Sequence, residues 1–457
     1  MKTQKNAGSN LLPLFADLNS KGVYASLEDM LDIHFIREHT DIVREAARKK
    51  HISIDIERLL TLDKKRRECV QAVDVLRGRH NAESERVPRI TDAIEREQVI
   101  AGLRSAKEEL SKKEEELKPI ETEYMRLLLL VPNIPDLSVP EGESDAQNQE
   151  LRRVGEPPRF DFEPKDHIAL LKDLDLADFE RGTKVSGFRG YFLKNEAVLL
   201  AQALWQFSFE KLIQKGFAIH MAPALVRGVT LVGTGWLPQG KDEVYKIEGE
   251  DLYLAGTAEV PMMGMYEDEI LDENEFPKLS AALSPCFRSE AGSYGKDTKG
   301  LYRVHEFFKV EQVVLCRADH EESVRWHEAL TKNAEDMMVE LGLPYRVVVN
   351  CGGDLGLGQV KKYDIEAWIP SQNKYGETHS SSYFHDFQTR RLNIRYRDGE
   401  GNLRFAHSLN NTMVATPRIL IQILENNQQA DGSVIVPEVL RKWVGKDRIQ
   451  KLKQEER

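Results

Sequence analysis

The chain has 457 residues, a formal net charge of −11, 30% charged residues and a mean hydropathy of −0.48. No run approaches the ~20 apolar residues that a membrane span needs, so an integral membrane protein is excluded. The 17 Phe, 13 Tyr and 5 Trp residues also exclude a wholly disordered chain. The four cysteines are far apart in the sequence, which argues against a zinc knuckle and favours a reducing, cytoplasmic compartment.

The N-terminal part of the chain is predicted to be helical. Residues 1–29 are a polar leader, for which we expect a flexible extension. A helical pattern covers 30–50, and two longer stretches follow, each with apolar residues at the 3.5-residue period of coiled coils. Because a short polar segment, 77–89, separates these stretches, we predict an antiparallel helical hairpin within 30–130, with Pro119 kinking its second helix.

The charge of this region differs from that of the rest of the chain. Residues 36–120 carry 20 Lys/Arg and 18 Asp/Glu, whereas the remainder carries 44 and 57. The predicted tip of the hairpin holds a cluster of basic residues, namely Arg77, Arg79, His80, Arg86 and Arg89. Such a cluster suits contact with phosphates, although a dimerisation rod explains the helical pattern equally well.

The remainder of the chain has a different texture. Residues 131–160 contain five prolines and a polar run, which marks a linker. Over 161–457, helical patterns at 166–181, 195–216 and 320–342 alternate with β-branched and aromatic runs. Several of these runs are joined by short turns. This arrangement predicts an α+β domain built on an antiparallel β-sheet flanked by helices.

Segment 284–312 reads as a strand, a long polar loop and a second strand. The alternation of side chains places Arg288 and Glu290 on one face of the first strand, and Arg303, His305 and Phe307 on one face of the second. A guanidinium, a carboxylate and an aromatic ring suit a phosphate, an adenine amino group and an adenine ring. A surface hairpin with cross-strand ion pairs is the simpler explanation of the same spacing.

Two further segments carry possible chemistry. In 409–428 a strand end turns into a helix, with Thr416 predicted as the N-cap and Pro417 at the first helical position. Arg418 then lies at the positive end of the helix dipole, where a cation is unfavourable unless an anionic ligand binds. In 217–227 a strand follows the long helix and ends at Pro223.

These three segments, in chain order, resemble motifs 1, 2 and 3 of class II aminoacyl-tRNA synthetases. Four other segments are similar to the seryl-tRNA synthetase family, namely GTGWLPQ (233–239), LAGTAEVP (254–261), KKYDIEAW (361–368) and DFQTRRLNIRYR (386–397). The predicted hairpin also resembles the N-terminal coiled coil of the bacterial-type enzymes. The resemblance extends from about Met30 to about Val444.

The resemblance implies an enzyme that uses ATP and Mg²⁺ to convert L-serine into seryl-adenylate. The seryl group would then pass to the 3′ end of tRNA(Ser) and of the selenocysteine tRNA, tRNA(Sec). A homodimer that does not associate with membranes is implied as well. Two alternatives stay open, a ligase that aminoacylates a carrier protein and a non-catalytic paralogue of the same fold. The first lacks the long hairpin, and the second is expected to have lost Arg288, Glu290 or Arg418.

The resemblance also implies roles for individual residues. Arg288 and Arg418 are the expected catalytic residues. ATP is expected to contact Arg288, Ser289, Glu290, Phe307, Glu377, Ser380 and Arg418. Serine is expected to contact Thr257, Ala258, Glu259, Arg288, Glu311, Asn410 and Thr412, with Glu311 and Thr412 reading its hydroxyl. Mg²⁺ is expected at Glu377 and Ser380, and tRNA at Arg77, Arg79, Arg86 and Arg89.

Two segments are unusual or could mislead. The stretch THSSSYFHDFQ (378–388) departs from the Ser/Cys-rich run of the family, and we expect it to repack the wall of the pocket near Glu377 and Ser380. Its residues His379 and His385 are not expected to bind a metal, since no third ligand is suitably spaced. CGGDLGLG (351–358) lacks the Gly-Lys-Ser/Thr of a phosphate-binding loop and is predicted to be a tight turn.

Overall fold

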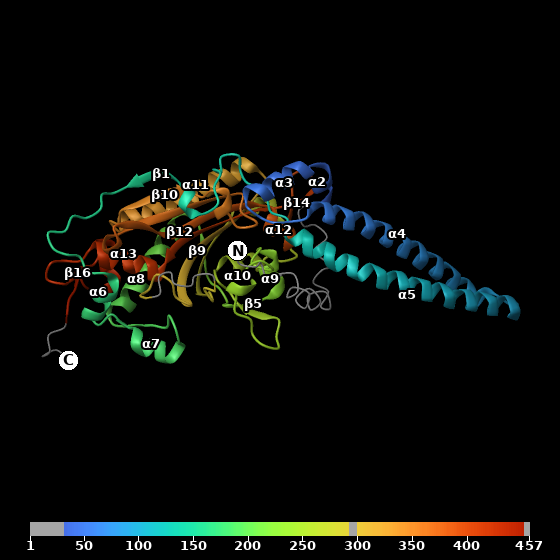
Figure 1. The fold of residues 1–457 in the computed structure, drawn as a ribbon, viewed down its shortest axis with the longest axis horizontal. Coiled ribbons are helices and arrows are strands. Elements are labelled where there is room, and N and C mark those ends of the chain that lie inside the picture. Colours follow the sequence, from blue (N-terminus) through green and yellow to red (C-terminus); the bar gives the residue numbers. More distant parts are fainter. Residues whose placement is uncertain (1–31, 292–298, 452–457) are drawn as a thin grey trace, which may run out of the picture. The chain divides into compact units, whose positions relative to one another are not determined.

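The computed structural model describes residues 32–291 and 299–451 (Figure 1). The predicted leader, 1–29, lies outside these residues. The described chain forms two compact units, one with the helices up to Arg48 and residues 52–131, the other with residues 49–51 and 132 onward. No helix in the described part of the chain is long and apolar enough to cross a membrane.

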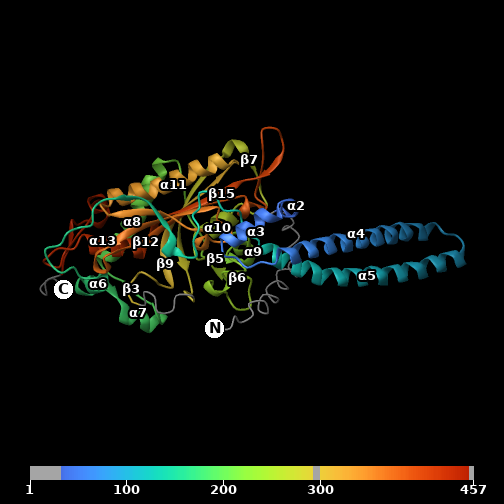
Figure 2. The same cartoon turned by 45° about the horizontal axis from the view of Figure 1, so that its top comes forward.

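The first unit contains the predicted antiparallel hairpin, formed by α4 (Ile56–Arg86) and α5 (Ala93–Leu129) (Figures 1 and 2). Asp55 and Asp92 cap these helices, because their carboxylates accept hydrogen bonds from backbone N–H groups of the first turn. The connection is shorter than the predicted 77–89, since α4 continues to Arg86. α5 continues through Pro119.

The helix predicted over 30–50 is divided into α2 (Ile33–Glu38) and α3 (Thr40–Lys49). Non-helical backbone at His39 separates them, with φ −125° and ψ 40°. The Thr40 hydroxyl donates a hydrogen bond to the Ile36 carbonyl oxygen at 2.8 Å. Such side-chain bonds compete with the helical pattern of the backbone, which explains why apolar spacing alone did not reveal the break.

The second unit is built on an eight-stranded sheet in the order β1-β10-β11-β12-β15-β9-β8-β4. All neighbouring strands are antiparallel except β4, which runs parallel to β8. The strands are β1 (Gln149–Val154), β4 (Ala218–Met221), β8 (Lys278–Phe287), β9 (Glu306–Cys316), β10 (Tyr345–Val349), β11 (Lys361–Ile369), β12 (Lys374–His385) and β15 (His407–Ala415). The predicted α+β class is confirmed.

Helices pack on this sheet through apolar faces (Figure 1). α11 (His320–Glu340) lies against β12 and β15, and α13 (Thr416–Asn426) lies against β11, β9 and α8 (Glu196–Gln214). The helix predicted over 166–181 is instead two short helices, α6 (His167–Asp173) and α7 (Phe179–Ser186), with strand β2 (Ala177–Asp178) between them.

Smaller elements complete the unit. They are β3 (Phe192–Leu193), β5 (Leu225–Arg227), α9 (Gly228–Gly233), β6 (Leu252–Leu254), α10 (Glu259–Gly264), β7 (Ile270–Asp272), α12 (Phe387–Arg391), β13 (Arg395–Arg397), β14 (Leu403–Phe405), β16 (Val434–Ile435), α14 (Arg441–Val444) and β17 (Arg448–Ile449). β13 and β14 form a hairpin across the turn at 397–402.

Three predicted boundaries require correction. The segment 131–160 was predicted as a linker, yet it supplies β1, whose polar residues suit an edge strand because one side remains open to solvent. β8 ends at Phe287 and β9 begins at Glu306, so Arg288, Glu290, Arg303 and His305 lie in the loop between the strands. Ala415, not Thr416, occupies the N-cap of α13, and the Thr416 hydroxyl instead accepts a hydrogen bond from Trp205 Nε1 at 2.7 Å.

Candidate functional site

A cleft of about 490 Å³ lies over the centre of the sheet. Strands β9, β11, β12 and β15, the start of α13 and the loops at 234–240 and 356–359 form its walls. Most residues predicted to bind small substrates line it, namely Thr257, Glu259, Arg288, Glu290, Phe307, Glu311, Glu377, Ser380, Asn410, Thr412 and Arg418. The fold therefore gathers side chains that are up to 161 positions apart in the sequence.

Two predicted residues are not among those that line the cleft. The Ser289 N–H donates to the Glu243 carbonyl oxygen at 3.1 Å, and its hydroxyl donates to the Asp242 carbonyl oxygen. Ala258 is fully buried and packs in the apolar cluster around Met262 and Met263. The positions of both side chains speak against direct contact with a ligand in this cleft.

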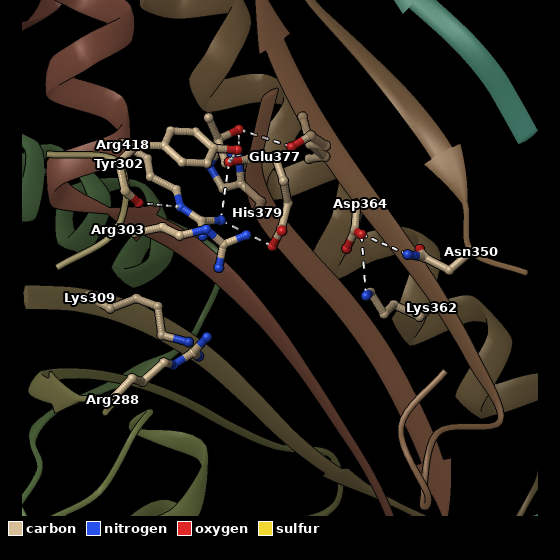
Figure 3. A network of polar contacts seen from close by, with 12 residues as sticks. Arg288, Tyr302, Arg303, Lys309, Asn350, Lys362, Asp364, Glu377, His379 and Arg418 are labelled. Atoms are coloured by element: carbon tan, nitrogen blue, oxygen red, sulfur yellow. Dashed lines mark hydrogen bonds and ion pairs between the residues drawn. The ribbon is translucent and has the colours of Figure 1, made fainter. Parts of the chain in front are cut away.

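Arg418 and Glu377 form an ion pair at one end of the cleft (Figure 3). Arg418 Nη1 lies 3.2 Å from Glu377 Oε1 and donates to the Glu377 carbonyl oxygen at 3.2 Å. The guanidinium also lies over the Tyr302 ring, 4.8 Å from its centre. Although burial opposes it, the Glu377 carboxylate holds the pKa of Arg418 above its usual value. The pair explains how a cation is tolerated at the positive end of α13.

A β-bulge brings Glu377 and Ser380 to the same side of β12. Ile365 pairs with His379 and Glu366 pairs with Glu377, so Thr378 is the extra residue. In a regular strand, residues three positions apart point to opposite faces, and one inserted residue brings them to the same face. A carboxylate and a hydroxyl oxygen facing one cleft are suitable ligands for Mg²⁺.

Several cations surround this carboxylate. Although burial opposes it, Arg418, Lys362 and Arg288 hold the pKa of Glu377 below its usual value. Lys362 is a cleft residue that sequence reasoning missed, and its Nζ lies 3.3 Å from Asp364 Oδ2 (Figure 3). Burial alone would lower the pKa of Lys362, but neighbouring carboxylates raise it. This end of the cleft therefore offers fixed positive charge to an anionic ligand.

Arg288 lies between two aromatic rings. Its guanidinium carbon is 5.5 Å from the Trp236 ring centre and 5.6 Å from the Phe307 ring centre, and its Nε donates to the Gly256 carbonyl oxygen at 3.3 Å. Cation–π contacts and this hydrogen bond limit the freedom of the side chain. Trp236 was missed as a site residue, although the segment GTGWLPQ that contains it had been singled out.

Glu290 lies across the cleft loop from two arginines. Arg303 Nη1 lies 3.2 Å from Glu290 Oε2, and Arg189 Nη1 lies 3.8 Å from the same oxygen. The backbone of Glu290 has φ 54°, in the left-handed region that is unfavourable for residues other than glycine. The turn aims this carboxylate into the cleft, which a continuous strand, as predicted from the sequence, would not have done.

The other end of the cleft is a polar compartment with opposing charges. Lys309 Nζ donates to Thr257 Oγ1 at 2.9 Å and forms an ion pair with the Glu311 carboxylate. Thr412 on β15 is the cross-strand partner of Glu311 on β9. Lys309 was missed, although strand alternation with Phe307 and Glu311 could have identified it. A cation, two hydroxyls and a carboxylate here can receive a small, polar, hydroxyl-bearing ligand.

Glu259 adds a second carboxylate to this compartment. Its Oε1 accepts a hydrogen bond from Gln388 Nε2 at 2.6 Å, and the Asn410 side chain lines the same cleft. Burial, together with the negative charge of Glu311, raises the pKa of Glu259 to about 7. A ligand that brings an ammonium group would relieve this penalty by favouring the ionised carboxylate.

The two histidines of the unusual stretch have separate partners. His379 is buried beside the cleft, with Nε2 3.2 Å from the Met413 carbonyl oxygen, and burial lowers its pKa to about 4. His385 Nε2 lies 3.1 Å from His320 Nδ1. Among the described residues, no three His, Cys, Asp or Glu side chains are grouped so as to hold a metal ion. The His379 ring is held by hydrogen bonds of both nitrogens, to Thr378 Oγ1 at 2.8 Å and to the Met413 carbonyl oxygen.

The raised pKa of Glu259 predicts a pH-dependent stability difference. The folded protein binds the proton of the Glu259 carboxyl group more tightly than the unfolded chain does. The stabilisation that this proton provides is therefore lost as the pH rises from about 4.5 through about 7. Glu259→Gln removes this titration. As the pH rises from 5 to 8, the free energy of unfolding of the variant should therefore rise by roughly 2–3 kcal/mol relative to that of the wild type, and its thermal midpoint should rise with it. The exposed change Glu250→Gln is the control, and a pH-independent difference for Glu259→Gln would contradict the prediction.

Comparison with known proteins places the chain in a family. The seryl-tRNA synthetase N-terminal domain matches residues 30–135, and the tRNA synthetase class II core domain (G, H, P, S and T) matches residues 243–427. A serine–tRNA ligase of Deinococcus radiodurans is 49% identical over 416 residues, which cover 91% of this chain and 98% of that protein.

Solved structures agree with this result. The seryl-tRNA synthetase from Pyrococcus horikoshii, complexed with ATP, has a TM-score of 0.82 and 39% identity, and the match covers 93% of this chain and 100% of that chain. The cytoplasmic serine–tRNA ligase of Naegleria fowleri, in complex with AMP, has a TM-score of 0.79 and 33% identity, with 93% and 99% covered. The chain therefore belongs to the seryl-tRNA synthetase family.

Proposed function

We propose that this chain charges tRNA with serine in two steps. Serine and ATP first give seryl-adenylate and pyrophosphate, and the seryl group then passes to the 3′ end of tRNA(Ser) and of tRNA(Sec). One observation carries the proposal within the structure. A cationic end, with Arg288 and Arg418, and a compartment suited to a hydroxyl-bearing ligand, with Glu311 and Thr412, lie in one cleft. The relatives named serine–tRNA ligase support it independently.

At the cationic end, adenylate formation requires positioning and charge neutralisation rather than a protein nucleophile, since it is an in-line transfer at phosphorus. Arg288 is suited to bind the α-phosphate and the serine carboxylate together, because cation–π contacts hold it between two rings. Arg418 can bind the far phosphates while keeping its contact with Glu377. Glu377 and Ser380 would hold Mg²⁺, which supplies further neutralisation of the triphosphate.

The adenine is assigned to Phe307, Glu290 and Arg418. Phe307 and the Arg418 guanidinium offer two flat surfaces between which a purine can stack. The Glu290 carboxylate can accept a hydrogen bond from the exocyclic amino group. The Ser289 hydroxyl donates to the Asp242 carbonyl oxygen, so in this structure only its acceptor lone pairs are available to ATP.

Serine specificity is assigned to the polar compartment. Glu311 and Thr412 would bind the substrate hydroxyl, and Glu259 and Thr257 the α-amino group. An analogue without the hydroxyl leaves these buried polar groups without a partner, and sites of this kind discriminate by about 10⁴–10⁵. Ala258 is buried outside the cleft lining, so it contributes to packing rather than to contact.

The helical hairpin is assigned to tRNA binding in the cytoplasm. Arg79, Arg86 and Arg89 lie at or near its tip, whereas Arg77 Nη2 forms an ion pair with Glu114 Oε1 at 2.8 Å. The carrier-protein ligase, the alternative considered from the sequence, lacks such a hairpin. The match of residues 30–135 to a seryl-tRNA synthetase N-terminal domain therefore favours tRNA as the acceptor.

An amino-acid panel in ATP–pyrophosphate exchange tests the substrate. Serine should drive exchange and alanine should not. Thr412→Val removes one predicted hydroxyl contact, so the preference for serine over alanine should fall by about 5- to 150-fold, the equivalent of ~1–3 kcal/mol. The control is Thr61→Val on α4, which lies outside the cleft lining and whose hydroxyl donates to the Glu57 carbonyl oxygen. Equal exchange with alanine in the wild type would exclude serine as the substrate.

Shortening the hairpin tests its role. Replacing residues 66–118 with a Gly/Ser turn should leave serine-dependent exchange near normal, because no proposed substrate contact lies there. Transfer of serine to tRNA should fall by orders of magnitude. Changing Arg79, Arg86 and Arg89 to Gln should weaken tRNA binding less and make its salt dependence shallower, whereas Lys at these positions should preserve it. If the shortened enzyme transferred serine to tRNA as well as the full chain does, the proposed role of the hairpin in tRNA binding would be wrong.

The proposed homodimer is testable by light scattering. α8, β4 and β5 carry exposed apolar side chains, namely Val198, Leu199, Ile213, Met221 and Leu225. An obligate interface of ~2,000 Å² or more would cover them, so we expect twice the chain mass of 52.2 kDa at micromolar concentration. Met221→Asp combined with Leu225→Asp should shift the population toward monomers. A monomer mass for the wild type would contradict the proposal.

A further inference from the structure

The loop 356–360 forms part of the cleft wall and is held in an unusual way. It overlaps the end of the segment CGGDLGLG (351–358), which was predicted to be a tight turn. Gly356, Leu357, Gly358 and Gln359 all line the cleft. The five backbone carbonyl groups of this loop all accept hydrogen bonds from residues that flank the α4–α5 hairpin in the sequence.

Lys50 provides the first set of contacts. It lies between α3 and α4, on the short segment 49–51 that belongs to the second unit. Its Nζ donates to the carbonyl oxygens of Gly356 at 3.2 Å, Leu357 at 2.9 Å and Gln359 at 2.6 Å. The side chain is buried, and burial holds the pKa of Lys50 well below its usual value. A buried amino group without hydrogen-bond partners is costly, and here the Lys50 Nζ lies within hydrogen-bond distance of three carbonyl oxygens of a single loop.

The residues that follow α5 provide the second set. The Asn133 N–H donates to the Leu357 carbonyl oxygen at 2.9 Å, and Asn133 Nδ2 donates to the carbonyl oxygens of Gly358 at 3.1 Å and Phe384 at 2.7 Å. The Asp136 N–H donates to the Val360 carbonyl oxygen at 2.9 Å. Asn133 is buried, so the loss of these bonds would leave carbonyl groups without a replacement from solvent.

Close backbone packing between Gly352 and Lys49 fixes the start of the segment 351–360. A Cβ atom at Gly352 would lie 2.1 Å from the Lys49 carbonyl oxygen. Only glycine permits this approach, which sets Lys50 next to the segment whose carbonyl groups it binds.

The loop faces the serine end of the cleft. Gln359 Nε2 donates to Ser382 Oγ at 2.8 Å, and Ser382 on β12 pairs with Asn410 on β15. Asn410 lines the cleft together with Glu259 and Thr412, the residues assigned to the serine amine and hydroxyl. A displacement of the loop would therefore reach the serine compartment through Ser382 and Asn410.

We propose that Lys50 and Asn133 are positioning residues that hold loop 356–360 in place and thereby set the affinity of the cleft for serine. The inference rests on the proposed function, because it assigns the compartment around Glu259 to serine. Neither residue lines the cleft, so both act through the loop.

ATP–pyrophosphate exchange with the full chain tests this role. Lys50→Met keeps the length of the side chain but removes its donors, and Asn133→Asp replaces a donor by an acceptor that faces two carbonyl oxygens. We expect KM for serine to rise about tenfold in each variant, with KM for ATP within about twofold of the wild-type value. Lys49→Met, at the adjacent lysine, is the matched control and should match the wild type.

The two Michaelis constants separate positioning from a general loss of structure. A merely structural role would reduce the fraction of active enzyme, which lowers kcat and leaves KM for serine unchanged. A lowered kcat with an unchanged KM for serine in both variants would overturn the inference. An equal rise of KM for serine and KM for ATP would overturn it as well. If Lys50→Met does not fold, Asn133→Asp decides alone. Absence of serine-dependent exchange in the wild type would instead overturn the proposed function.

Discussion

The ion pair between Arg418 and Glu377 is the interaction on which the cleft depends. A cation in the first turn of α13 is repelled by the helix dipole, and a carboxylate on β12 offsets that repulsion. The carboxylate reaches the cleft only because β12 has an extra residue at Thr378. Helix start, bulge and ion pair are thus one arrangement, and a regular β12 would leave the helix with an uncompensated charge.

The two ends of the cleft differ in how they treat charge. At the Arg418 end, cations outnumber carboxylates and keep Glu377 ionised. At the other end, burial makes ionisation of Glu259 unfavourable near neutral pH. An anionic ligand is thus favoured at one end and a cationic group at the other, over a floor formed by the same antiparallel strands. This polarity fits a reaction in which the carboxylate of an amino acid attacks the α-phosphate of a nucleoside triphosphate and pyrophosphate leaves, and it requires no charged nucleophile from the protein.

Sequence patterns predicted the fold class and the hairpin, and most of the residues that the family resemblance implied for the small substrates line the cleft. Local periodicity indicated Phe307, and it could also have identified Lys309, which alternates with Phe307 and Glu311 along β9 but was missed. The patterns were less informative where tertiary contacts override them. Glu290 was placed on a strand, but a left-handed turn aims its carboxylate, and Ser289 was grouped with its neighbours although its hydroxyl is already bonded. The bonds of Lys50 could not be foreseen either, because they join residues about 300 positions apart.

The hydrogen bonds that hold loop 356–360 are accepted by its main-chain carbonyl groups. This determines which changes of sequence the loop can tolerate. Every residue has the same main-chain carbonyl group, so replacement of the Leu357 or Gln359 side chain would keep the hydrogen bonds that Lys50 Nζ donates. Insertion or deletion of a single residue would instead move the carbonyl oxygens away from the donor groups that they now face. The segment should therefore accept changes of side chain more readily than changes of length.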